Sequence, residues 1–176
     1  MIIGDLMVIA RTKLLLQDDL LKPRPVFRIH YTGPKPTRFY KEIPELLASS
    51  FRVETGQIQE KSIKWDKGDP QKFRILWEMD KDLDKFSYYM VELELIGSES
   101  KGVGSVSVSL KDGVLRTEYP QDTVWERSLL YEMLRIMWHR TFYTQKREEW
   151  IRDGRRMLAT FVDELKKVMH EYREEA

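Results

Sequence analysis

The sequence predicts an α+β fold: an antiparallel meander of about six strands packed on one long C-terminal helix, with short helices after the first strand. Two observations carry this prediction. Segments that alternate apolar and polar residues follow one another between positions 27 and 119, separated by Gly- and Pro-containing turn signals. From position 126 onward, the apolar residues recur instead at the three- and four-residue spacing of a helix.

The expected strands share a regular apolar face. The segment FRIHY (27–31) alternates apolar and polar residues, and Ile63 and Trp65 fall on one face of the next segment. Three later segments continue the pattern with the apolar sets Phe73, Ile75, Trp77, Met79; Tyr89, Val91, Leu93, Leu95; and Val106, Val108, Leu110. The motif KDG (111–113) predicts a hairpin turn after the last set.

Two regions are predicted to be helical. Residues 36–51 space Phe39, Ile43 and Leu47 at helical intervals, and Pro44 indicates a kink or two short helices. The C-terminal helix has an apolar stripe formed by Met157, Leu158, Phe161, Leu165, Val168, Met169 and Tyr172.

The stripe of the C-terminal helix can be continued backwards at about 100° per residue. This projection places Trp150, Tyr143, Ile136, Met133 and Leu129 on the inward side. It also places Arg140 and Arg147 within the stripe, and Trp138 and Phe142 on the opposite face. Two interpretations remain open: the helix breaks between 143 and 156, near Gly154, or it is continuous and buried on both sides.

The order of strand, short helices, meandering strands and long C-terminal helix resembles the helix-grip fold of the START-like (SRPBCC) superfamily, over residues 25–173. The resemblance implies a curved sheet that wraps the final helix and leaves a cavity between them. Members include carriers of lipids and hydrophobic ligands, aromatic cyclases and chaperone co-activators, with no universal catalytic residues. We expect residues 25–176 to form a single domain on which residues 1–24 pack as an N-terminal segment.

Composition excludes several classes of site. The 176 residues contain no cysteine, which excludes disulfides, Cys-ligated metals and thiol catalysis. The absence of asparagine, together with 34% charged residues, predicts a protein from a hyperthermophile. Asp5, Arg11 and Lys13 interrupt the apolar start, so we expect a cytoplasmic protein with no membrane span.

Neither a metal nor a cofactor is expected. The three histidines, at positions 30, 139 and 170, lack the spacing of a shared metal site. The segment DKDLDK (80–85) has alternating aspartates, but Lys85 and Val91 stand where a calcium loop needs Gly and Glu.

The favoured function is that of a non-enzymatic binding protein that sequesters an apolar or amphipathic small ligand between the sheet and the C-terminal helix. Large rings ordinarily fill a core. In the helix-grip arrangement that the resemblance implies, Trp65, Trp77 and Tyr89 would line the cavity instead. Arg140 and His30 would then orient the polar end of the ligand.

The alternative function is a protein- or RNA-interaction module that uses the helix around 126–156. Trp138 and Phe142 would meet a second subunit or another protein, with Arg147, Arg152, Arg155 and Arg156 beside them. Nucleic acid ranks below a protein partner because acidic residues interleave with these arginines and the net charge is only +1. An enzyme, with His30 and a sheet glutamate as acid and base, ranks last. A carrier should have a hollow lined by the three rings, whereas an interaction protein should have a filled core and an exposed Trp138.

Overall fold

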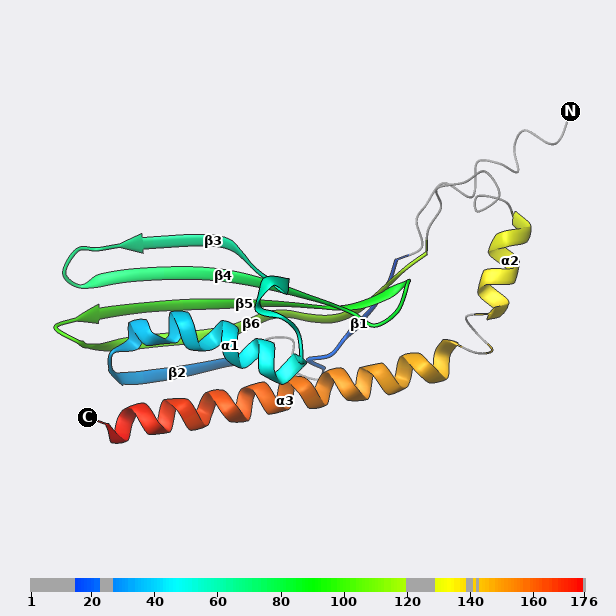
Figure 1. Cartoon of the computed structure of the whole chain (residues 1–176). Coiled ribbons are helices and arrows are strands. Elements are labelled where there is room, and N and C mark those ends of the chain that lie inside the picture. The colour runs from blue at the N-terminus through cyan, green and yellow to red at the C-terminus, as the bar shows by residue number, and fades with distance from the viewer. Residues whose placement is uncertain (1–14, 23–26, 120–128, 139–140, 142, 176) are drawn as a thin grey trace, which may run out of the picture.

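The computed structural model describes residues 15–22, 27–119, 129–138, 141 and 143–175. It confirms the predicted α+β class: one open antiparallel sheet of six strands lies against a long C-terminal helix (Figure 1). The strands are β1 (Leu15–Asp19), β2 (Phe27–Pro34), β3 (Ile58–Asp66), β4 (Gln71–Asp82), β5 (Ser87–Ser100) and β6 (Val103–Glu118).

The sheet is a meander of β3, β4, β5 and β6 completed by two strands from the N-terminal part of the chain. β6 is long enough to pair with both of them on one edge: β2 lies along residues 103–110 and β1 along residues 114–118. Residues 15–19 are therefore part of the sheet, and Leu20 lies in its core. Residues 1–14 of the expected N-terminal segment lie outside the described residues.

The prediction of a hairpin at KDG is wrong, because β6 runs on without reversing through residues 111–113. Leu110 pairs with Leu93 and Asp112 with Glu92, so Lys111 is the extra residue of a β-bulge. The residues that follow, 114–118, hydrogen-bond with β1 on one side and β5 on the other. Two long ladders thus override the local preference of Asp-Gly for a turn.

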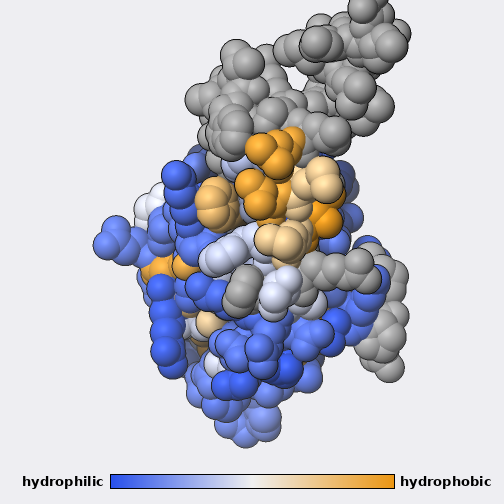
Figure 2. Space-filling model, turned by 90° about the vertical axis from the view of Figure 1, so that its right-hand side faces the viewer, coloured by the Kyte–Doolittle hydropathy of each residue, from blue (hydrophilic) through white to orange (hydrophobic). Residues whose placement is uncertain are grey.

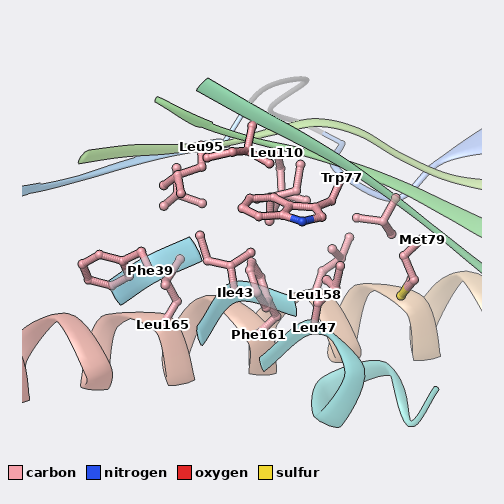
Figure 3. Close-up of a cluster of buried hydrophobic side chains, with 14 of the residues drawn as sticks. Phe39, Ile43, Leu47, Trp77, Met79, Leu95, Leu110, Leu158, Phe161 and Leu165 are labelled. Atoms are coloured by element: carbon pink, nitrogen blue, oxygen red, sulfur yellow. The ribbon is translucent and has the colours of Figure 1, made fainter. Parts of the chain in front are cut away.

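One face of the sheet is covered by two helices, α1 (Phe39–Phe51) and α3 (Thr144–Glu174). α1 is a single helix that contains Pro44, preceded by a short 3₁₀ helix at Pro36–Arg38. Side chains from the sheet, α1 and α3 meet in one apolar layer (Figure 3). The predicted apolar faces of β4, β5 and β6 are all buried there, as are Leu158, Phe161, Leu165, Met169 and Tyr172 of α3.

Neither interpretation of the C-terminal region is correct as stated. α3 is unbroken through Gly154, and a separate helix, α2 (Leu129–Trp138), precedes it with its axis turned away (Figure 1). Ile136 and Met133, predicted to face inward, are 56% and 62% exposed. The projection failed because it assumed one helix axis from α3 back to α2. No described helix combines the length and apolar composition that a membrane span requires.

Candidate interaction surface

α2 is an inverted helix, with its charged side chains turned toward the protein and its apolar ones toward solvent. Its only charged residues, Glu132 and Arg135, are partly buried and buried, respectively. The outward side chains are between 48% and 62% exposed: Leu130, Met133, Leu134, Ile136, Met137 and Trp138. They gather into one apolar patch at the end of the molecule where α2 lies (Figure 2). An ordinary surface helix has the opposite arrangement.

The inward side of α2 is held by Arg135. Its guanidinium lies 5.3 Å from the centre of the Tyr119 ring, and its Nη2 donates to Glu132 Oε1 at 3.1 Å. Its Nε and Nη1 are buried with no hydrogen-bond acceptor among the described residues. Burial raises the pKa of Tyr119, although the positive charges of Arg147 and Arg135 oppose the shift. This contact between a cation and an aromatic ring helps to hold α2 against the end of the sheet.

Beneath this contact, a chain of hydrogen bonds joins the first turns of α3 to the sheet. Burial raises the pKa of the Tyr143 hydroxyl, so it remains protonated at neutral pH and donates to Asp84 Oδ2 at 2.9 Å. It then accepts from Ser87 Oγ at 2.7 Å, and Ser87 accepts from Thr117 at 2.7 Å. Thr117 in turn accepts from Arg147 Nη1. The directions follow from Asp84: a carboxylate can only accept, so the single hydroxyl hydrogen of Tyr143 goes to it, and Ser87 and Thr117 each donate to the next oxygen of the chain.

The residues expected at a partner interface do not lie on one common surface in the structure. Trp138 is 57% exposed on α2, within the apolar patch. Arg147 is buried and bonds Asp18 and Thr117, so it does not belong to this surface. Arg152, Arg155 and Arg156 are exposed on α3 instead. Phe142 and Arg140 lie outside the described residues.

The three aromatic residues expected to bind a ligand do not lie in one site. Trp77 and Tyr89 are 1% and 0% exposed in the packed core, where the Tyr89 hydroxyl donates to the Trp150 carbonyl at 2.6 Å. Trp65 is half-buried near the sheet edge, with its ring 5.2 Å from that of Phe73. His30 is exposed on β2, and both it and Trp65 line an open hollow of about 890 Å³ at one end of the sheet.

The acid–base pair considered for His30 is not assembled. His30 is the register partner of Ser107, whereas Glu94 is that of Ser109. Glu94 accepts hydrogen bonds from Arg74 and Lys111, and Glu78 forms an ion pair with Lys61 at 2.6 Å. Among the described residues, no group of three or more His, Asp and Glu side chains has an arrangement that could hold a metal ion.

Sequence reasoning missed the inward role of α2's charged pair and the hydrogen-bonded chain. The chain joins β1, β5, β6, the 83–86 turn and the start of α3, which are far apart in the sequence, so no local pattern marks it. The one usable signal was the composition of 129–138, where eight of ten residues are apolar or aromatic, more than the single apolar stripe of an ordinary surface helix requires.

The comparisons with known proteins do not identify a family for this chain. No family model matches the chain, and no curated protein matches it in sequence. Among solved structures, the crystal structure of Ara h 8.0201 aligns over 76% of this chain and 97% of its own, with 11% identity and a TM-score of 0.20.

Proposed function

We propose that this protein is a binding protein that docks α2 into an apolar groove on a protein partner. The observation that carries the proposal is the inverted helix: its charged pair faces the protein, while six large apolar side chains face solvent. Apolar patches of several hundred Å² on a soluble protein mark interaction sites. This is the alternative function of the sequence analysis, with a protein as the partner.

The width of the apolar surface favours a groove over a flat partner. At about 100° per residue, the six outward side chains span an arc of about 200° around α2, with Arg135 and Glu132 in the remaining arc. A flat face would leave much of this arc in water. A groove encloses it, as in other complexes in which a helix is received by an apolar cleft.

A second copy of the chain fits this surface less well. α2 has 10 residues. Such a helix is about 15 Å long, so two copies packed side by side would bury much less than the roughly 800 Å² per partner of a stable interface.

A membrane surface also fits less well. Helices that lie on membranes present Lys and Arg beside their apolar face. The one basic residue of α2 is Arg135, and its side chain is buried against Tyr119.

The packed interior supports docking over sequestration of a ligand between sheet and helix. Trp77 and Tyr89, two of the three rings that would line such a cavity, are enclosed by core side chains. The arrangement of sheet and C-terminal helix is compatible with a helix-grip fold in which Trp77 and Tyr89 are packed in the core. On composition, we also propose that the protein is cytoplasmic and comes from a hyperthermophile. A Tm above about 90 °C is expected for a hyperthermophile protein, and thermal unfolding measures it.

The experiment compares the wild-type protein with the double variant Met133→Asp/Ile136→Asp. Its matched control is Ile63→Asp/Val103→Asp, which places the same two charges on apolar sheet residues that are 50% and 57% exposed. Each tagged protein is incubated with soluble extract of the organism that encodes it. We expect one protein to be retained by the wild type and the control and lost with the α2 variant. The purified pair should then bind one to one, at least about 30-fold more weakly with the α2 variant.

Three results would contradict the proposal. The first is equal retention by the α2 variant and the wild type. The second is a wild-type dimer, measured by light scattering, that the α2 variant dissociates, because a second copy would then be the occupant. The third is flotation of the wild type with lipid vesicles that the α2 variant abolishes.

A further inference from the structure

The sheet face turned away from α1 and α3 contains a hollow of about 890 Å³ at the end where β3 joins β4 and β5 joins β6. The strand register identifies the residues that form its floor. Five successive register partners lie in one row across the sheet: Tyr31, Val106, Gly97, Phe73 and Trp65. Val106 and Phe73 of this row are buried, and a Cβ on Gly97 would meet both of them. The side chains of the row thus fill the core side, and its backbone forms the floor of the hollow.

The rows on either side of the floor turn their side chains into the hollow, because neighbouring residues of a strand point to opposite faces. They bring together four basic side chains, His30, Lys64, Lys72 and Arg74. They also bring four hydroxyls, Thr32, Ser98, Ser105 and Ser107. Ile96, 43% exposed, lies in the same row as Arg74 and Lys64 and offers an apolar contact.

The positive charge in this hollow is only partly neutralised. Lys64 and Lys72 have no hydrogen bond or ion pair with any described residue. Arg74 pairs with the buried Glu94, which Lys111 also contacts at 2.9 Å, so one carboxylate serves two cations. Asp66 is the one carboxylate among the described residues that line the hollow, and its Oδ1 accepts from the backbone N–H of Gly68 at 3.1 Å. Two ammonium groups are therefore available to an anion.

We propose that this hollow binds a phosphorylated small molecule of about nucleotide size. Ammonium groups and hydroxyls are donors that suit phosphate oxygens. Ile96 would contact the non-phosphate part, and the volume lies within the range of small-molecule sites. Single-stranded nucleic acid fits less well because it needs exposed rings for base stacking, and the Trp65 ring stacks on Phe73 on the core side of the sheet.

Calorimetry with pyrophosphate, ADP and a short single-stranded RNA as separate probes tests this proposal. We expect pyrophosphate and ADP to bind the wild-type protein, ADP more tightly. The double variant Lys64→Ser/Lys72→Ser should weaken both at least tenfold. The control Lys41→Ser/Lys167→Ser removes the same charge from the exposed sides of α1 and α3 and should bind as the wild type does. In amide NMR spectra, shifts with ADP should centre on residues 96–98.

Three results would overturn the proposal. One is the absence of heat and of amide shifts with both pyrophosphate and ADP at millimolar concentration. Another is an equal loss of affinity in the two double variants, which would show attraction by net charge alone. The third is tighter binding of RNA than of ADP with a steep salt dependence, which would assign the face to nucleic acid. None of these results depends on α2, so the docking proposal is tested separately.

Discussion

Arg147 Nε donates to the carboxylate of Asp18, and this ion pair joins residues 129 positions apart in the sequence. The arginine side chain is 8% exposed and the aspartate 41%. The same guanidinium donates to Thr117 of β6. One side chain near the start of α3 therefore fastens that helix to the edge strand β1 and to the longest strand of the sheet.

Replacing Arg147 with Met should lower the free energy of unfolding by about 1–3 kcal/mol. Removing one partner of a buried pair is costly, but Asp18 is partly solvated and can regain water, which reduces the loss. Urea denaturation at neutral pH measures it. Asp18→Asn, which keeps a hydrogen-bond acceptor beside Arg147, should have the smaller effect. Unchanged stability of Arg147→Met would show that the pair does not hold α3 in place.

Replacing Arg135 with Met should leave stability within about 1 kcal/mol of the wild type or raise it, in contrast to Arg147→Met. Arg135 buries two nitrogen atoms, Nε and Nη1, whose hydrogens have no acceptor among the described residues. Exchanging an unsatisfied polar group for an apolar one of similar shape removes a penalty that offsets the lost contact with Tyr119. Denaturation of the two variants side by side is the measurement. A large loss with Arg135→Met would reveal an acceptor in the folded protein in solution.

Gly154→Ala should destabilise the protein by about 1 kcal/mol, although alanine is the better helix former. A Cβ at this position would lie 2.9 Å from Leu20 Cδ1 and 2.9 Å from Tyr89 Cε1, so α3 would have to move off the sheet. Gly56→Ala is the matched control, since nothing lies within 4 Å of its added Cβ. Thermal unfolding should give a lower Tm for Gly154→Ala alone. A higher Tm would mean that α3 has room to shift.

Glu94→Gln should lower stability by about 1 kcal/mol at neutral pH and have no effect in acid. Burial alone would raise the pKa of Glu94, but hydrogen bonds from Lys111 and Arg74 outweigh it, and the pKa lies below its ordinary value. A carboxyl group whose pKa is lowered by folding contributes its full stabilisation at a pH above its pKa in the unfolded chain, about 4.3. This stabilisation is lost as the pH falls through the lower pKa of the folded state. Denaturation series at pH 7, 5 and 3 test this dependence. A difference that persists at pH 3 would point to packing instead of charge.

The elements that periodicity predicted correctly are those whose neighbours in sequence are also their neighbours in the fold. The meander β3 to β6 joins consecutive strands, and the inward faces of β4 to β6 were read from alternation alone. The stripe of α3 from Leu158 to Tyr172 was read in the same way. The prediction of a hairpin at KDG failed because β6 continues beyond this motif, where it pairs with both β1 and β5. β1 lies about one hundred positions away in the sequence, so its pairing with β6 leaves no local pattern.

The two candidate sites could be predicted only in part. His30 and Trp65 were singled out and both line one hollow, but this hollow lies on the sheet face turned away from the helices; the His30 side chain faces it, whereas the Trp65 ring stays on the core side. Lys64 and Lys72 were not predicted as binding residues, because the sequence alone does not distinguish a single lysine on a strand from any other solvated surface lysine. Trp138 was expected to be exposed, but the inversion of α2 was not foreseen, because the helix was continued from α3.

Alternation and helical spacing are properties of adjacent residues, so they suffice for the α+β class, the inward faces of the strands and the stripe of α3. Everything that depends on where distant segments meet was decided by the tertiary structure. This holds for the position of β1 along β6, the burial of Arg147 beside Asp18, the turn of α2 away from α3 and the gathering of basic side chains from β2, β3 and β4. Charges and hydroxyls have no periodicity of their own, and only the register of the strands brings them together.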